Sequence, residues 1–405
     1  MKKTFFYAVI GKNFGDEGKG MAVDFLSLRH RKTLVIRQNG GAQSGHTVEL
    51  KDGRRFVFQE LSSGSFRGAD TFWANTFYPD LYKLGEELDA FNKINGSAPT
   101  VYAERSACFT IIDDILLNMA AEVARGEHKH GSCGMGIYEA KCRCEAGYGI
   151  QIGELQTLDL DSLVLRLKDI RKKYLPLRFK QLQLSADKLG DYGELLQSDE
   201  ILYNFAIAIM DHFKYVHVVE EVKPFLEEYD GVIFENGQGL LLDSENIEYA
   251  PHVTASRTGI IGPHNYLKRF GFALDEVVYV TRSYVTRHGA GPLPLECAKE
   301  KIGIVSEDGT NVTNQWQGAL RYAKHENLSR FVEPVNADCY EAIKEKEQMP
   351  LRSLMITHLN ETGDCVVFDD TNCRISDLIK EAKWKETFGR FYMSKTRYSE
   401  EMESV

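Results

Sequence analysis

The chain has 405 residues, of which 43% are hydrophobic and 27% charged, and its formal net charge is −10. This composition is typical of a globular protein whose core is large enough to fold without a disulfide or a structural metal ion. The net negative charge argues against a general nucleic-acid binder, because such binding depends on the neutralisation of many phosphates by lysine and arginine. A small anionic ligand needs only a few local donors and remains compatible with this charge.

The first apolar segment, residues 5–10, follows two lysines and therefore resembles the start of a secretory signal. It is very short and continues without the small residues of a cleavage site, so we predict a buried β-strand instead. No apolar run approaches the roughly 20 residues that a membrane-spanning helix needs. Eight cysteines are scattered along the chain without the second clustered pair of a zinc site, which favours reduced thiols in a cytoplasmic protein.

A glycine-rich stretch, IGKNFGDEGKG at residues 10–20, follows this strand and leads into the helical pattern MAVDFL. A helix N-terminus attracts phosphate, and glycines in the loop before it let the backbone approach an anion closely. Lys19 supplies a compact positive charge at the same place. We therefore predict a phosphate-binding loop with backbone contacts from Gly15, Gly18 and Gly20.

This loop departs from the Walker pattern, because Gly20 stands where the metal-binding hydroxyl belongs. A magnesium ion would therefore need another oxygen ligand, and Asp16 is the obvious candidate. The alternative is a tight turn between strand and helix, in which Asp16 or Glu17 caps the helix.

A second glycine-rich stretch, RQNGGAQSGHTVEL at residues 37–50, follows the predicted buried strand 33–37. In an open parallel sheet, ligands bind at the carboxyl ends of the strands. This placement brings the imidazole of His46 beside the first loop. It favours a functional role for His46 over the structural role that an isolated histidine usually has.

The rest of the chain predicts further strands and several amphipathic helices. Buried strands are indicated at residues 231–237 and 276–286, and helical periodicity at residues 111–125, 160–170 and 200–213. No repeat, low-complexity tract or Pro/Ser-rich linker divides the sequence. We predict one α/β domain over residues 1–405, with a large, mostly parallel central sheet flanked by helices, similar to P-loop NTPases, and with helical insertions.

Five short motifs follow one another in the order of a known enzyme family. GDEGKG and GGAQSGHT, in the two loops, are similar to GDEGKGK and GGHNAGHT. FENGQGLLLD at residues 234–243, PHVTASRTG at 251–259 and TRHGAGPLPLE at 286–296 are similar to FEGAQGTLLD, PYVTSSNTT and TRVGAGPFPTE. By these motifs, which cover about the first three quarters of its length, the chain resembles the adenylosuccinate synthetase family.

Members of this family join IMP to L-aspartate at the expense of GTP, with magnesium, in purine biosynthesis. The resemblance implies that Asp16 takes the N1 proton of IMP, so that O6 attacks the γ-phosphorus. It also implies that Asp16 binds Mg²⁺ together with the backbone carbonyl of Gly45. His46 is implied to be the second catalytic residue, which stabilises charge during phosphoryl transfer and departure of the leaving group.

The resemblance further implies two sets of binding residues. It assigns the nucleotide phosphates to the two loops, at Gly15, Glu17, Gly18, Lys19, Gly20, Gly45, His46 and Thr47. It assigns the purine nucleoside monophosphate to Asp16, Gln43, Ser132, Cys133, Arg143, Gln238, Thr254 and Gly289.

Three of these assignments have structural alternatives. A buried amide would explain Gln238, and a capping hydroxyl would explain Thr254. Arg143 matches, with gaps, an arginine that reaches across the dimer interface of the family, which implies a homodimer. A solvated surface arginine is the alternative.

Two segments depart from the family where substrates are selected. The aspartate-binding loop TTGRRRRTG corresponds to TNVTNQWQGALRY at residues 310–322, without arginine at the four matched positions, although a dicarboxylate favours fixed guanidinium groups. The guanine-reading TKxD segment corresponds to VEPVNAD at residues 332–338, with Pro334 and Asn336 in place of lysine and aspartate, or with Asp338 after a gap. Asparagine cannot accept both hydrogen bonds of guanine symmetrically. The sequence therefore leaves open whether the enzyme uses GTP or ATP.

Three functions are compatible with these residues. The first is the family's own ligase reaction, in which IMP, aspartate and GTP give adenylosuccinate, GDP and phosphate. The second is the same two-step chemistry with another purine nucleotide such as dGMP, another amine, or ATP. The third is a nucleotide-binding regulator without ligase activity, although such a protein would have little physical reason to keep both Asp16 and His46. None of the three predicts a nucleic acid or a membrane as partner.

Overall fold

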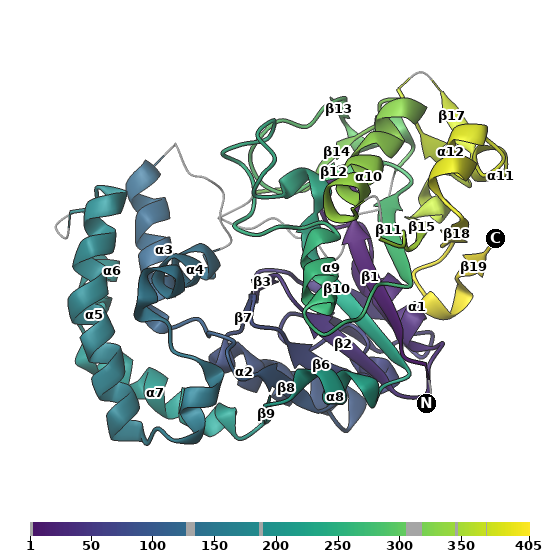
Figure 1. The fold of residues 1–405 in the computed structure, drawn as a ribbon. Helices are drawn as coiled ribbons and strands as arrows, with labels where there is room; N and C mark the ends of the chain where they lie inside the picture. The colour runs from purple at the N-terminus through teal and green to yellow at the C-terminus, as the bar shows by residue number, and fades with distance from the viewer. Residues whose placement is uncertain (1–2, 127–133, 186–188, 305–317, 345–346, 370) are drawn as a thin grey trace.

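The computed structural model describes residues 3–126, 134–185, 189–304, 318–344, 347–369 and 371–405 (Figure 1). Within them, a ten-stranded sheet has the order β19-β18-β15-β11-β1-β10-β2-β6-β8-β9, and every neighbouring pair is parallel except β18 and β19. The predicted large, mostly parallel sheet is confirmed. Its strands are β1 (Phe5–Gly11), β2 (Thr33–Arg37), β6 (Asp70–Trp73), β8 (Val101–Glu104), β9 (Val216–Val219), β10 (Gly231–Gly239), β11 (Glu276–Arg282), β15 (Leu351–Thr357), β18 (Arg390–Met393) and β19 (Glu403–Ser404).

The central strands are buried on both faces, which explains their continuous apolar sequences. In β1, Phe6 and Ala8 belong to a cluster with residues of helices α9 and α10, whereas Tyr7 and Val9 belong to a cluster with residues of α1. Successive side chains of a strand point to opposite faces, so each central strand contributes to two hydrophobic layers. The flanking helices are α1 (Lys19–Ser27), α2 (Leu81–Asn95), α8 (Val222–Glu227), α9 (Ile261–Lys268), α10 (Leu328–Ala342), α11 (Ile375–Leu378) and α12 (Ala382–Thr387).

A group of helices is inserted between β8 and β9 and stands to one side of the sheet (Figure 1). The predicted helical segments 111–125, 160–170 and 200–213 all fall within this group, so the helical insertion is confirmed. Leu163, Leu167, Ile209 and other apolar residues of this group share a second core with α2. The helices are α3 (Ile112–Arg125), α4 (Ile137–Arg143), α5 (Leu160–Leu182), α6 (Asp191–Leu195) and α7 (Asp199–Phe213).

The predicted strand 276–286 is divided in two. Strand β11 of the main sheet ends at Arg282. The next strand, β12, pairs with β14 in a separate, small antiparallel sheet. The change of sheet directs the chain after β11 over the carboxyl edge of the main sheet. The short strands are β3 (Gly40–Gly41), β4 (His46–Glu49), β5 (Arg55–Phe58), β7 (Phe77–Tyr78), β12 (Val285–Arg287), β13 (Glu296–Cys297), β14 (Arg321–Ala323), β16 (Cys365–Val367) and β17 (Asn372–Arg374).

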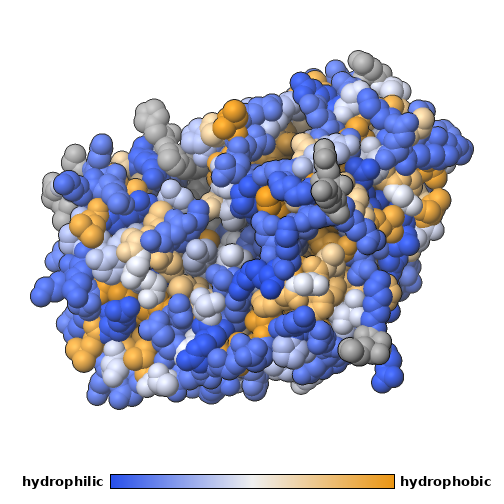
Figure 2. Space-filling model, viewed as in Figure 1, coloured by the Kyte–Doolittle hydropathy of each residue, from blue (hydrophilic) through white to orange (hydrophobic). Residues whose placement is uncertain are grey.

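The molecular face in Figure 2 is mostly hydrophilic, with apolar residues in small groups. Among the helices of the described residues, none has both the length and the apolar character needed to span a bilayer.

Replacing Phe234 by alanine tests the core of the sheet. The Phe234 ring is fully buried in β10 and meets the Tyr266 ring of α9, with 5.8 Å between ring centroids. The cavity should lower the free energy of unfolding by about 3–5 kcal/mol, a large part of the stability of an ordinary domain. Denaturant unfolding measures this loss. Leu165→Ala, at a side chain that is 68% exposed, is the control and should change little. Equal effects of the two substitutions would contradict the assigned core.

Candidate functional site

A large cleft lies at the carboxyl edge of the main sheet. Its lining includes the segments that follow β1, β2, β10, β11 and β15, and its volume is about 1390 Å³. The edge where parallel strands end is the usual ligand site of such sheets. The volume exceeds the roughly 300–1000 Å³ of a pocket for one small ligand, so the cleft has room for two ligands side by side.

The loop after β1 is wound tightly by residues with positive φ. Gly15, Asp16 and Gly18 have φ values of 94°, 53° and 91°. A non-glycine residue rarely adopts this conformation, so the fold holds Asp16 in a costly geometry at the surface of the cleft. At Gly20, a Cβ atom would lie 2.8 Å from the Thr47 carbonyl oxygen. The absence of a side chain at residue 20 thus lets α1 pack against the second loop.

Glu17 closes the first loop on itself. Its Oε1 accepts hydrogen bonds from the backbone N–H of Asn13 at 2.8 Å and from the Asn13 side-chain amide at 2.7 Å. Burial raises the pKa of the Glu17 carboxyl to about 7. The Thr357 hydroxyl at the end of β15 donates to the Glu17 carbonyl at 2.9 Å and ties the loop to the sheet. The described contacts of Glu17 therefore stabilise the loop that was predicted to bind phosphate.

Lys19 is the positive charge of this loop and is 3% exposed. Burial lowers the pKa of its ammonium group, while the carboxylates of Glu17, Asp16 and Glu235 act in the opposite direction. A buried ammonium group that is incompletely compensated attracts an anion such as a phosphate. The position of Lys19 in the cleft wall agrees with the predicted phosphate contact.

His46 is held by a buried carboxylate of β10. Its Nδ1 lies 2.6 Å from Oε1 of Glu235. Although burial raises the pKa of Glu235, the charge of Arg37 and the hydrogen bonds from His46 and Ser63 outweigh it and hold this pKa at about 2. Because Glu235 is ionised, Nδ1 must carry the proton and donate it, which leaves Nε2 to face the cleft. Burial lowers the pKa of His46 to about 4, so the imidazole is neutral without ligands.

Two further residues fix the carboxylate that orients His46. The backbone N–H of Ser63 donates to Oε2 of Glu235 at 3.1 Å, and the Ser63 hydroxyl donates to Oε1. The Arg37 guanidinium at the end of β2 lies 3.5 Å from Oε2. Arg37, His46 and Glu235 are all buried, so His46 rests on a rigid network beneath the cleft floor.

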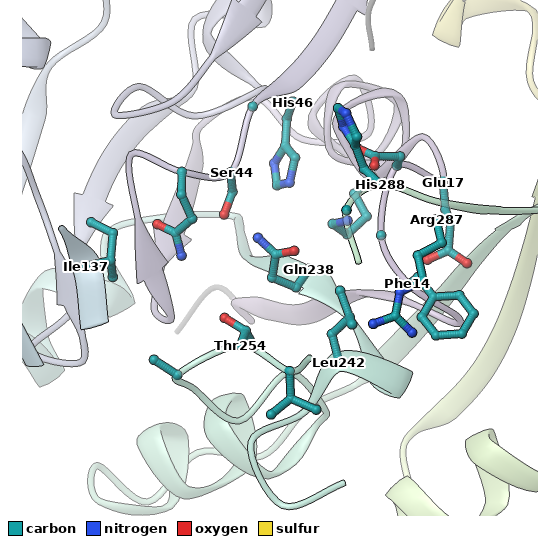
Figure 3. A pocket seen from close by; sticks show the side chains of 18 of the residues that line it. Phe14, Glu17, Ser44, His46, Ile137, Gln238, Leu242, Thr254, Arg287 and His288 are labelled. Atoms are coloured by element: carbon teal, nitrogen blue, oxygen red, sulfur yellow. The ribbon is translucent and has the colours of Figure 1, made fainter. Parts of the chain in front are cut away.

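The second loop presents polar atoms that have no partner among the described residues. These atoms are Oε1 of Gln43, Oγ of Ser44 and Oγ1 of Thr47. Buried polar atoms without a partner are costly, and a bound ligand would satisfy them. Figure 3 shows His46, Gln238 and Thr254 facing the same hollow from different elements. Gly45 and Gly289 also line the cleft, which thus brings together most of the predicted site residues.

Comparison with known proteins assigns the chain to a family. Residues 8–317 match the sequence profile of the family described as adenylosuccinate synthetase. The chain belongs to the adenylosuccinate synthetase family. Adenylosuccinate synthetases are similar to it at 28% identity in Acaryochloris marina and 30% in Synechocystis, over 74% and 71% of this chain. The matches span 65% and 62% of those two relatives' own length. The synthetase of Teredinibacter turnerae is 31% identical over 73% of this chain and 67% of its own length.

Two solved structures share the fold over nearly the whole chain. The fully ligated adenylosuccinate synthetase of Plasmodium falciparum matches with a TM-score of 0.69 at 18% identity, over 98% of both chains. The succinoaminodeoxyadenylate synthetase of cyanophage S-2L, bound to dGMP and dATP, matches with a TM-score of 0.60 at 14% identity, over 99% of this chain and 95% of its own. At these identities, the likeness concerns the fold of the synthetase family.

The predicted magnesium ligands fit the chemistry of that ion. Asp16 offers a carboxylate and Gly45 a backbone carbonyl, and both residues line the cleft. Magnesium prefers oxygen ligands and completes its octahedral shell with water and substrate phosphates, so two protein ligands are enough. Among the described residues, no group of three or more His, Cys, Asp and Glu side chains is arranged to hold a metal ion.

Arg143, a predicted contact of the purine nucleotide, is not among the cleft residues. Ser132 and Cys133 lie outside the described residues. The Arg143 guanidinium is buried inside this chain, where it pairs with Asp114 at 2.9 Å and donates to the carbonyls of Phe109 and Tyr148. A solvated surface position for Arg143 is therefore wrong. Its described contacts are internal, and it does not line the cleft.

The segment aligned with the guanine-reading motif, VEPVNAD, lies in a helix and not at the cleft. Pro334 and Asn336 lie within helix α10. Asp338 is buried and accepts hydrogen bonds from the Ile260 N–H and the Tyr279 hydroxyl, so it supports packing. VEPVNAD is thus part of a helix, and none of its residues is among those that line the cleft.

The end of β15 carries a second segment that is similar to the guanine-reading motif. Here the sequence THLN, residues 357–360, begins at Thr357, the last residue of the strand LRSLMIT, and His358 and Asn360 line the cleft. His358 has a φ of 60°, and its Nδ1 lies 2.8 Å from the Thr357 hydroxyl. The pattern THLN resembles TKxD, with histidine and asparagine as its polar residues. The signal in the sequence that indicates this segment is the end of the apolar run of β15, which the polar residues His358 and Asn360 follow.

The acid sensitivity of the folded protein should depend on His46. Its pKa falls from 6.5 to about 4 on folding, so the unfolded chain binds a proton that the folded chain excludes between these pH values. The contribution of His46 to the free energy of unfolding is therefore fully present above pH 6.5. About 3 kcal/mol of it is lost as the pH falls toward 4. The measurement is the free energy of unfolding, without ligands, of the parent and His46→Gln from pH 7 to pH 4.

The parent should lose stability relative to His46→Gln as the pH falls. His217→Gln, at an exposed histidine of β9, is the control and should follow the parent. A constant difference between the parent and His46→Gln across this range would show that His46 is not held neutral.

Proposed function

We propose that the chain is a nucleotide-dependent carbon–nitrogen ligase of the adenylosuccinate synthetase type. In this reaction GTP phosphorylates O6 of IMP, and L-aspartate then displaces the phosphate to give adenylosuccinate, GDP and phosphate. The observation that carries the proposal is the pairing, in one cleft, of Asp16 in the first loop with His46 oriented by Glu235. Asp16 removes the N1 proton of the purine, which makes O6 the nucleophile.

The two loops would hold the phosphoryl groups between these catalytic residues. Lys19 and the backbone of Gly15, Gly18 and Gly20 face the nucleotide phosphates from the first loop. Gly45 and Thr47 face them from the second. The approach of a phosphate raises the proton affinity of the nearby imidazole, so His46 becomes a donor when the ligand is bound. The network of Glu235 under Nδ1 stabilises the imidazolium that results.

Magnesium, when bound by Asp16 and the Gly45 carbonyl, supplies positive charge that offsets the charge of the transferring phosphoryl group. The purine nucleoside monophosphate would lie on the opposite wall. Gln43, Gln238, Thr254 and Gly289 are the residues proposed to contact it, and all four line the cleft.

A second candidate keeps this chemistry and changes the substrates. His358 and Asn360 at the end of β15 differ from the lysine and aspartate of the guanine-reading motif, which favours ATP as an alternative to GTP. The fold also matches a phage synthetase bound to dGMP and dATP, which makes dGMP a second purine substrate to test. The residues aligned with the aspartate-binding loop fall mostly outside the described residues.

The same proposal includes a cellular setting and a set of partners. We place the enzyme in the cytoplasm as a homodimer that acts on small molecules: a purine nucleoside monophosphate, a nucleoside triphosphate and an amino acid. Membership of the family supports this setting. The net charge of −10 supports the expectation that nucleic acid is not a partner.

Asp16→Asn tests the proposed base. The amide keeps the size of the side chain but cannot take a proton, so nucleotide-dependent phosphate release should fall by about 10²–10⁴-fold. The melting temperature should stay close to that of the parent. Asp161→Asn, at an exposed residue in the first turn of α5, is the matched control and should keep full activity. Near-normal turnover by Asp16→Asn would contradict the assignment.

Asn360→Asp tests the proposed base-reading position. An aspartate accepts two hydrogen bonds from guanine, so the ratio of kcat/KM for GTP to that for ATP should rise by about tenfold or more. Asn372→Asp, an exposed change of equal charge on β17, should leave the ratio unchanged. An unchanged ratio in Asn360→Asp would remove this residue from the nucleotide site.

The substrate identities follow from one matrix of assays. IMP, GMP and dGMP are combined with GTP or ATP, with and without aspartate, and phosphate release is measured in each combination. Turnover with IMP, GTP and aspartate supports the family's reaction, and turnover in another combination supports the second candidate. A non-catalytic regulator, the remaining hypothesis, predicts no coupled turnover in any of them.

A further inference from the structure

Two cysteines meet beside the cleft without taking part in the proposed ligase chemistry. Cys108 follows β8 in a segment that forms an isolated bridge with Gln151, and Cys144 follows the last residue of α4. Both are free thiols and both are partly exposed, so a small reagent can reach them. Although they are far apart in sequence, the fold brings them to one place.

Gly149 shows how close the two sulfur atoms lie. A Cβ atom at residue 149 would be 2.9 Å from Sγ of Cys108 and 3.3 Å from Sγ of Cys144. Both sulfur atoms therefore border the same small gap, which exists because residue 149 has no side chain. The backbone of Gly149, with φ −65° and ψ 152°, is one that alanine adopts without strain.

Arg143 spans the same region and supplies a fixed positive charge. Its guanidinium donates to the carbonyl of Phe109, next to Cys108, and to the carbonyl of Tyr148, next to Gly149. The hydrogen bond from Cys144 and the charge of Arg143 lower the pKa of Cys108, whereas that hydrogen bond and burial raise the pKa of Cys144. Cys108 is thus the attacking thiol and Cys144 the resolving thiol of the pair.

The pair lies at the end of a helix that forms the cleft wall. Helix α4 contributes Tyr138, Glu139 and Lys141 to that wall, and Cys144 comes directly after its last residue. A covalent link from Cys144 to Cys108 would attach the end of α4 to the segment after β8. The link would thereby connect α4 of the helical insertion to the carboxyl end of β8 in the main sheet.

We propose that Cys108 and Cys144 are a redox modification site that forms a reversible intramolecular disulfide. The oxidant is a small-molecule disulfide such as glutathione disulfide. The Cys108 thiolate attacks one of its sulfur atoms, forms a mixed disulfide and releases one glutathione. Cys144 then loses its proton, attacks Sγ of Cys108 and releases the second glutathione. The two cysteines lose two electrons and two protons, which the two glutathione molecules gain.

The test oxidises the reduced full chain with glutathione disulfide, blocks the remaining thiols and digests the denatured protein with trypsin. Residues 106–125 and 144–166 form two tryptic peptides that contain Cys108 and Cys144 as their single cysteines. We expect these peptides to become linked, the chain to lose the mass of two hydrogen atoms, and a thiol reductant to reverse the change. An oxidised chain without this link, or with glutathione adducts alone, would overturn the proposal.

Four variants separate the proposed pair from general cysteine oxidation. Cys144→Ser should stop at a glutathione adduct on Cys108, and Cys108→Ser should form neither the adduct nor the link. Gly149→Ala places a methyl group between the sulfur atoms and should slow the link by about tenfold or more. Cys142→Ser, two residues away and also partly exposed, should form it at the parent's rate.

The outcomes need no catalytic assay, so they are independent of the proposed ligase activity. Melting temperatures establish that each variant is folded before oxidation. A link that forms equally fast in folded Gly149→Ala, or that depends on Cys142, would contradict the assigned geometry.

Discussion

The site depends on a charge buried in the middle of the sheet. Glu235 lies on β10 between β1 and β2, is fully buried and keeps its carboxylate ionised because Arg37, Ser63 and His46 surround it. A carboxylate in such a place is stable only with this compensation, and removal of one partner would leave it costly. The need to satisfy one buried charge therefore fixes the end of β2, the loop after it and the imidazole of His46 together.

The first loop also depends on a buried carboxyl group that needs hydrogen-bond partners. Glu17 turns inward to Asn13, and Thr357 holds its carbonyl from β15, so the peptide before Gly18 cannot turn freely. Asp16, the neighbouring acid, is left at the cleft with a positive φ. The two adjacent carboxylates thus divide their tasks: Glu17 builds the loop, and the geometry that it builds presents Asp16.

The sequence predicts the parts of this arrangement that local patterns encode. Apolar runs predict β1, β2, β10 and β11, and periodicity predicts α3, α5 and α7. Glycines at the ends of the first two strands predict both loops of the cleft. Burial of a charged side chain has no such pattern, so the internal position of Arg143 and the role of Glu235 follow only from the fold. The resemblance also matches VEPVNAD to a substrate-reading segment, whereas its place in helix α10 depends on packing against the sheet.

The contact between β15 and the first loop connects substrate choice to catalysis. Thr357 binds the Glu17 carbonyl and also lies 2.8 Å from the imidazole of His358, which faces the cleft next to Asn360. Residues 357–360, which are similar to the guanine-reading motif but differ from it at two positions, therefore also hold the loop of Asp16 in place. A substitution at residues 358–360 therefore lies two hydrogen bonds of Thr357 away from the loop that carries Asp16, the proposed base. Thr357 thus joins the proposed base-reading residues to the proposed catalytic loop, so variants of Asn360 should be compared in both nucleotide preference and turnover.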